Sequence, residues 1–128
     1  MIWIVFFAKS GKRVGFLKNR IGVIQRGKLE LNELEQTVSF AGRELYFTNR
    51  EFRILHLFFQ YPGQVFSKGQ IYRYAAGERE KDDLHTVEIS ISRIRKKLRE
   101  CASEEMIVTV HGRGYKWKKE IETYFYEC

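Results

Sequence analysis

The chain has 128 residues and a formal net charge of +7, and 44% of its residues are hydrophobic, 15% aromatic and 30% charged. This is the length of about one domain, and the apolar content is sufficient for a core, which excludes extensive disorder. No apolar run approaches the ~20 residues of a transmembrane helix, and the positive charge indicates a polyanionic partner, either nucleic acid or an anionic membrane surface.

The first quarter of the chain carries the whole excess of positive charge. Residues 1–28 contain seven Lys and Arg and no acidic residue, whereas the remaining 16 Lys and Arg are matched by 16 Asp and Glu. Residues 1–8 are apolar and precede the first charges, which is the reverse of the order in a secretory signal. We therefore expect residues 1–19 to form a basic and apolar N-terminal extension. It acts either as an arm that contacts polyanions or as an extra strand lying against the domain.

Four short segments between residues 20 and 47 alternate between apolar and polar side chains. Alternation with a period of two is typical of strands in a sheet that buries one face. Turn-forming residues separate the segments. We predict a four-stranded antiparallel sheet with strands over Ile21–Gln25, Lys28–Leu31, Gln36–Phe40 and Glu44–Phe47.

Two capping boxes mark the change from strands to helices. In Thr48–Glu51 and in Ser67–Gln70, a hydroxyl residue is followed three positions later by Glu or Gln, so that each satisfies a backbone donor of the other. The first box opens a helix that stops at Tyr61–Gly63, where proline and glycine end it. The second box opens a shorter helix, which Gly77 closes.

The third helix has the clearest apolar stripe in the sequence. It begins after Asp82 and Asp83, either of which can cap it, and it runs to about Cys101. Its apolar residues recur at intervals of four and three positions, as one buried face of a helix requires. They are Val87, Ile91, Ile94, Leu98 and Cys101.

The side of the third helix away from the stripe is basic. From Ser92 to Arg99, five of eight residues are Lys or Arg and none is acidic. A helix enters the major groove of DNA with its first turns on base edges, while basic residues further along meet phosphates. The alternative is a solvated basic face. The residues of this side and its flanks are His85, Ile89, Ser92, Arg93, Lys96, Arg95, Lys97 and Arg99.

Two alternating segments after the third helix, Ile107–Val110 and Tyr115–Lys118, predict a β-hairpin. Its tip offers His111 and Arg113, and the glycines on either side of Arg113 allow the backbone to approach a phosphate or the narrow minor groove. Taken alone, this Gly-Arg-Gly sequence predicts only a tight turn. The order of two helices, a basic helix and a hairpin favours the DNA-binding interpretation.

Four motifs resemble the OmpR/PhoB-type winged-helix domain, which is the DNA-binding output domain of response regulators in bacterial two-component systems. The resemblance covers residues 20–118 and leaves residues 119–128 as a C-terminal tail. It implies an α+β winged helix-turn-helix with an N-terminal four-stranded antiparallel sheet, three helices and a C-terminal β-hairpin wing. The motifs are Leu45–Leu55, Tyr61–Ser67, Thr86–Leu98 and Val108–Tyr115.

The resemblance also implies DNA contacts, residue by residue, on the third helix and the wing. They fall on His85, Thr86, Ile89, Ser90, Ser92, Arg93 and Arg95 of the helix and on His111 and Arg113 of the wing, and the basic face adds Lys96 and Lys97. Three positions depart from the family pattern, with Ala76 in place of the usual Trp, His85 in place of a common Arg and Ser92 in place of a frequent basic residue. The last two changes predict a different base readout.

Double-stranded DNA is the partner that follows from the resemblance, together with RNA polymerase through the Glu78–Asp83 loop, and no membrane contact is expected. The 19 residues before the domain are too few for a receiver domain. Control by phosphorylation is therefore not carried over from the resemblance, and we expect the chain to be monomeric in solution and able to dimerise on tandem DNA half-sites.

Together these patterns predict a cytoplasmic, sequence-specific, double-stranded DNA-binding transcriptional regulator. The alternative is a protein that binds nucleic acid or an anionic surface without specificity, through its basic N-terminus. An enzyme is not expected, because His56, His85 and His111 lie in separate elements and the sequence contains no metal-ligand cluster, cofactor motif or nucleophile motif. Cys101 and Cys128 are expected to be reduced thiols.

Overall fold

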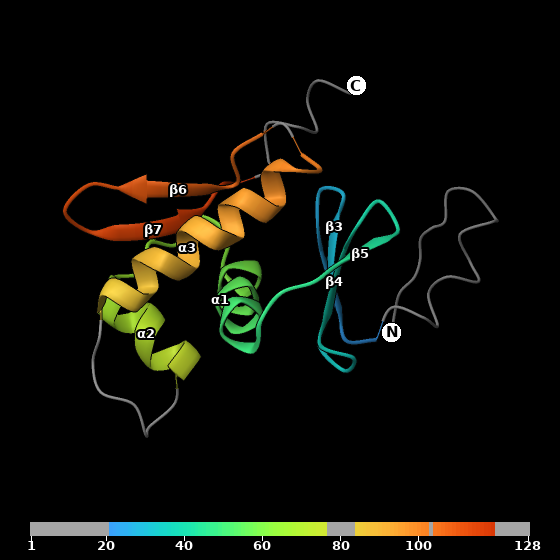
Figure 1. The fold of residues 1–128 in the computed structure, drawn as a ribbon, viewed down its shortest axis with the longest axis horizontal. Coiled ribbons are helices and arrows are strands. Elements are labelled where there is room, and N and C mark those ends of the chain that lie inside the picture. The colour runs from blue at the N-terminus through green and yellow to red at the C-terminus, as the bar shows by residue number, and fades with distance from the viewer. Residues whose placement is uncertain (1–20, 77–83, 103, 120–128) are drawn as a thin grey trace.

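The computed structural model describes residues 21–76, 84–102 and 104–119, which form the predicted combination of a four-stranded sheet, three helices and a C-terminal hairpin. Helix α1 (Asn49–Gln60) lies in the middle, with the sheet on one side and the other helices and the hairpin on the other side (Figure 1). These further elements are α2 (Lys68–Ala76), α3 (Leu84–Arg99), β6 (Ile107–Val110) and β7 (Gly114–Trp117).

Some predicted features lie outside the described residues. These are the extension 1–19, the Glu78–Asp83 loop with the helix cap at Asp82 or Asp83, the helix stop at Gly77, and the tail from residue 120 onward. The predicted limits of the domain at residues 20 and 118 stay predictions.

The sheet contains four consecutive antiparallel strands in the order β2-β3-β4-β5. Leu31 and Val38 are register partners on neighbouring strands and are buried against the helices, as the period-two pattern predicts. The last strand ends earlier than predicted, because Tyr46 and Phe47 leave the sheet and lead into α1. The strands are β2 (Val23–Arg26), β3 (Leu29–Asn32), β4 (Thr37–Phe40) and β5 (Arg43–Leu45).

Both predicted capping boxes are confirmed. The Thr48 hydroxyl accepts a hydrogen bond from the Glu51 amide, and the Glu51 carboxylate accepts one from the Thr48 amide at 3.0 Å. At the start of α2, Ser67 and Gln70 make the same reciprocal pair at 2.8 and 3.1 Å. These bonds satisfy backbone donors that the first turn of a helix otherwise leaves unpaired, so the sequence specifies where both helices begin.

Helix α3 ends at Arg99, two residues before the predicted end. There the Cys101 amide donates to the Leu98 carbonyl, which is a tighter turn than the α-helical pattern. The stripe is buried as predicted from Val87 to Leu98 and joins a core that includes Phe58, Phe59 and Trp117, whereas Cys101 lies beyond the helix and is only half-buried. The core therefore fixes which side of α3 is left for solvent.

The hairpin is attached to the loop between α1 and α2. Phe66 and Tyr115 exchange two backbone hydrogen bonds of 2.8 and 2.9 Å, and the Gly63 amide donates to the Trp117 carbonyl at 2.8 Å. A Cβ at Gly114 would lie 2.0 Å from the Phe66 carbonyl oxygen, and the φ angle of this glycine is +141°. Only glycine allows this close approach, which holds β7 against the body of the domain.

Candidate nucleic-acid interface

One side of α3 faces solvent along the whole helix. Its exposed residues include an apolar side chain, Ile89, which is 38% exposed, between polar and basic neighbours. Thr86 is half-buried at the edge of this side. The remaining exposed residues of the predicted set are His85, Ser92, Arg93 and Lys96. The helical period had assigned each of them to the side opposite the stripe.

Ser90 does not belong to this surface. Its side chain is only 5% exposed, because position 90 lies three residues after Val87 and four before Ile94, on the buried side of the helix. The resemblance had assigned Ser90 to the DNA-contacting set. The structure instead buries it on the packed side of the helix.

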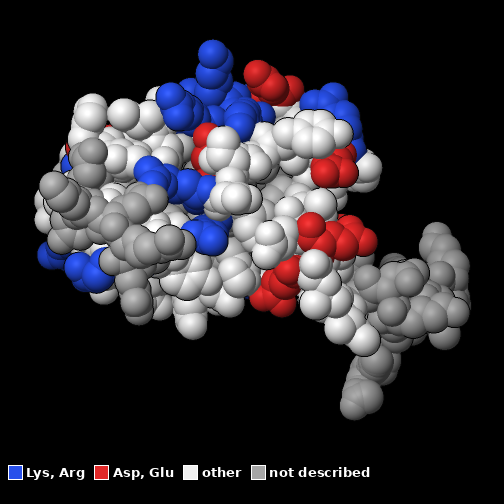
Figure 2. All heavy atoms as spheres, turned by 60° about the horizontal axis from the view of Figure 1, so that its bottom comes forward, with Lys and Arg blue, Asp and Glu red and all other residues white. Residues whose placement is uncertain are grey.

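The basic residues of α3 differ in exposure and in ion pairing, and Arg99 is both exposed and paired with Glu105. Arg93 and Lys96 are exposed, and neither has an ion-pair partner within the described part of the chain. Arg95 and Lys97 are half-buried and are held by acidic residues of the same molecule. In Figure 2 most Lys and Arg side chains of the visible face lie over the helical side, and most Asp and Glu side chains lie nearer the sheet. The charge available to a polyanion is therefore smaller than the count of basic residues suggests.

Lys97 is held by Glu51, which is almost fully buried. The Lys97 ammonium lies 2.7 Å from Glu51 Oε1 and 5.1 Å from the centre of the Phe47 ring. The same carboxylate caps α1. The sequence places Lys97 in the predicted contact set, whereas the structure uses its charge to hold α3 against α1.

The first turn of α3 carries an ion-pair network that the sequence pattern does not reveal. Glu88 accepts hydrogen bonds from Lys68 of α2 and from His85 of its own helix. The Lys68 ammonium is the main cause that holds the pKa of Glu88 below its usual value, and His85 adds to it. The hydrogen bond that Lys68 donates to Glu88 raises the pKa of Lys68, although the loss of solvent around the ammonium opposes this shift. Since Lys68 and Glu88 are 20 positions apart, no spacing rule could have joined them.

The tip of the hairpin projects His111, Gly112 and Arg113 into solvent. The Arg113 amide donates to the Val110 carbonyl at 2.9 Å, and Gly112 has a φ angle of +75°, which closes the turn tightly. The predicted pair of exposed side chains is therefore present at the tip, and neither has an ion-pair partner within the described residues.

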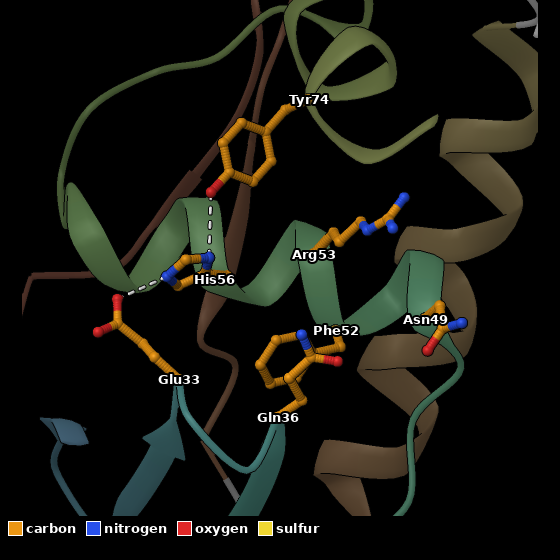
Figure 3. Close-up of a pocket in the computed structure, with 7 residues that line it drawn as sticks. All are labelled: Glu33, Gln36, Asn49, Phe52, Arg53, His56 and Tyr74. Carbon is orange, nitrogen blue, oxygen red and sulfur yellow. Dashed lines mark hydrogen bonds and ion pairs between the residues drawn. The ribbon is translucent and has the colours of Figure 1, made fainter. Parts of the chain in front are cut away.

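A hollow of about 350 Å³ lies elsewhere, between α1, α2 and the turn that joins β3 to β4. In it, His56 Nε2 lies 2.8 Å from Glu33 Oε2, and Nδ1 lies 3.0 Å from the Tyr74 hydroxyl (Figure 3). Burial raises the pKa of Tyr74. The lining residues are Glu33, Gln36, Asn49, Phe52, Arg53, His56 and Tyr74, which include no serine, threonine or cysteine nucleophile. The contacts of His56 with Glu33 and Tyr74 tie the turn between β3 and β4 to both helices.

Within residues 21–76, 84–102 and 104–119, no three His, Cys, Asp or Glu side chains are grouped so that they could hold a metal ion. None of the helices in these ranges combines the length and the apolar character of a membrane span.

The comparisons with known proteins agree with this geometry. The family model of the C-terminal domain of transcriptional regulatory proteins matches residues 42–117. The heme response regulator HssR of Staphylococcus aureus is 30% identical over 95 residues, which are 74% of this chain and 42% of HssR. The chain thus spans about two-fifths of the length of the curated relatives that it matches.

Two solved DNA-binding domains have the same fold. The domain of CpxR from E. coli superposes with a TM-score of 0.67 and 32% identity, covering 76% of this chain and 96% of that domain. The domain of RstA from Klebsiella pneumoniae, solved in complex with the RstA box, gives a TM-score of 0.65 and 26% identity over 75% of this chain and 96% of that domain.

Proposed function

The chain belongs to the family of C-terminal domains of transcriptional regulatory proteins, and on this premise we propose that it is a sequence-specific, double-stranded DNA-binding transcriptional regulator. One observation carries the proposal: Arg93 and Lys96, unpaired within the described residues, lie on the same exposed helix side as Ile89. RstA, a similar domain, was solved in complex with its box. We expect such a DNA-binding regulator to act in the cytoplasm.

In the proposed complex, α3 lies in the major groove. The planar guanidinium of Arg93 pairs with the O6 and N7 atoms of guanine. The Ser92 hydroxyl donates to or accepts from a base edge, and Ile89 packs against a thymine methyl group. His85 and Thr86 lie near the start of the helix, where the first turns approach base edges and backbone. Lys96, one turn beyond Ser92, neutralises a phosphate.

The hairpin supplies the second contact. His111 and Arg113 reach the backbone or the minor groove beside the site that α3 reads, and a narrow minor groove attracts Arg through its negative potential. Ser90, Arg95 and Lys97 are left out of this interface, because the first is buried and the other two are held within the domain.

Two partner predictions extend the proposal. We propose that the chain is monomeric in solution and dimerises on tandem half-sites, and that the Glu78–Asp83 loop contacts RNA polymerase. Sedimentation without DNA at micromolar concentration tests the first proposal. We expect a single species with the mass of one chain of 128 residues. Transcription in vitro tests the second proposal, with a variant in which Gly and Ser replace the Glu78–Asp83 loop. This variant should still bind the promoter but should no longer activate transcription.

The alternative function is binding without specificity, favoured by the seven basic residues and no acidic residue in 1–28. Selection of bound sites from random duplex DNA separates the two. A regulator enriches one motif and binds it ~10³-fold or more tightly than random duplex. Absence of any enriched motif, with equal affinity for all duplexes, would overturn the proposed function and support the alternative.

A further inference from the structure

Arg95 lies on the flank of α3 that faces the hairpin, and its guanidinium is bound to the hairpin on several sides. Nη2 donates to the Ile107 carbonyl and to the Thr109 hydroxyl, both at 2.9 Å. The group also lies 5.6 Å from the centre of the Tyr115 ring on the second strand of the hairpin. One side chain of the helix thus contacts both strands of the wing.

The charge of Arg95 is neutralised within the domain. Its Nε lies 2.9 Å from Glu105 Oε2, in the segment that leads into β6, and its side chain is only 21% exposed. Glu105 also pairs with Arg99 at 3.4 Å. By contrast, Arg93, two residues earlier, is exposed and has no such partner among the described residues. A guanidinium whose charge is paired with Glu105 and whose Nη2 is bound to the hairpin is a poor ligand for a phosphate.

The two strands of the hairpin are held by different parts of the domain. The backbone of Phe66 and Gly63 binds β7, as described above. Arg95 binds β6, through the Ile107 carbonyl and the Thr109 side chain. An isolated hairpin is marginally stable, so its direction relative to α3 depends on such anchors. The rigid fork of Arg suits this task, because it holds several acceptors in one plane.

We propose that Arg95 is a positioning residue and not a DNA contact: it locks the hairpin to α3, so that Arg93 on the helix and Arg113 at the tip meet DNA at a fixed separation. The proposal rests on the proposed function, because it explains how the two contacts act together. It also has a consequence in the free protein, where the anchor holds β6 whether or not DNA is bound.

The free protein provides the first test. In Arg95→Ala, the backbone amides of residues 107–113 should exchange hydrogen about tenfold faster or more than in the wild type, while those of α1 stay unchanged. Arg93→Ala is the matched control, since it removes the neighbouring exposed guanidinium without touching the hairpin. Equal exchange of residues 107–113 in Arg95→Ala and the wild type would overturn the anchoring role.

The second test measures coupling on the duplex recovered by selection. If Arg113→Ala weakens binding about tenfold, Arg95→Ala should weaken it similarly, and the double variant should remain near tenfold, since a misplaced tip no longer uses Arg113. Arg93 and Arg113 should instead act independently. If each single substitution to Ala weakens binding about tenfold, the double variant should bind about a hundredfold more weakly than the wild type. Multiplying losses for Arg95→Ala and Arg113→Ala, or no loss for Arg95→Ala, would overturn the proposal.

Salt dependence distinguishes a positioning residue from a phosphate contact. In the Arg113→Ala background, adding Arg95→Ala should leave the slope of log affinity against log salt unchanged, whereas a lost phosphate contact lowers it by about 0.9. Should Arg95→Ala fail to fold, Thr109→Val removes one acceptor of Arg95 at an exposed strand position and enters the same comparisons, with smaller effects expected. If selection recovers no motif, the proposed function fails. The anchoring of the hairpin by Arg95 is then tested by hydrogen exchange alone.

Discussion

Glu51 of α1 and Lys97 of α3 are joined by an ion pair of 2.7 Å, although they are 46 positions apart. The carboxylate is only 3% exposed and also accepts the Thr48 amide, so one side chain caps α1 and attaches the third helix to it. Lys97 is 35% exposed, and its charge is paired within the domain by this contact. A basic residue on the helix that we propose to bind DNA can therefore be structural.

Lys97→Ala should destabilise the domain by about 1–3 kcal/mol, because it leaves a buried carboxylate without its cationic partner. Lys96→Ala, its exposed neighbour, should change stability by less than about 0.5 kcal/mol. Denaturant unfolding of both variants measures the difference. Equal stability of the two would show that the Glu51 contact contributes nothing.

Lys96→Ala should act on binding instead. Loss of one phosphate contact lowers the salt slope by about 0.9 and weakens binding to specific and random duplex alike. Titration at several salt concentrations measures this slope. A salt slope equal to that of the wild type would remove Lys96 from the proposed interface.

Arg93→Ala should cost about 1–3 kcal/mol of specific binding if its guanidinium pairs with guanine. Folding should be unaffected, because Arg93 is exposed and lies off the buried stripe. Binding to the selected duplex and to random duplex, each compared with melting temperature, separates readout from stability. A folded variant with unchanged affinity for the selected duplex would contradict the assignment.

Ile94→Ala tests the opposite side of the same helix. Ile94 is completely buried, so the cavity left behind should reduce the free energy of unfolding by about 2–5 kcal/mol. DNA binding should fall only in proportion to the unfolded fraction. A variant that melts like the wild type and yet fails to bind DNA would mean that Ile94 has a role in recognition.

Glu88→Gln should give a pH-dependent change in stability. Lys68 and His85 lower the pKa of Glu88 in the folded state, so this pairing contributes stability above the ordinary Glu pKa of about 4.3 and loses it as the pH falls through the lowered value. The wild type should therefore exceed Glu88→Gln in stability at pH 7 and converge with it in acid. Chemical unfolding at pH 7, 5 and 3 measures the gap, and a constant gap would exclude the linkage.

The sequence by itself determined the elements of this protein. Capping at Thr48–Glu51 and Ser67–Gln70, the period of two in the strands and the stripe of Val87 and Ile94 depend on residues a few positions apart, and short-range spacing encodes them directly. The burial of Ser90 could have been predicted from the helical period, because position 90 lies three residues after Val87 and four before Ile94, yet we assigned it to the DNA contacts.

The tertiary structure alone decided what the basic side chains of α3 do. Arg93, Arg95, Lys96 and Lys97 are equivalent in a count of charges, yet only Arg93 and Lys96 remain without an ion-pair partner in the described chain. Arg95 finds its acceptors 12 and 14 positions away, and Lys97 finds Glu51 46 positions away. Such pairs form because packed elements cross at particular points, and the crossing is set by the whole core and by no local pattern.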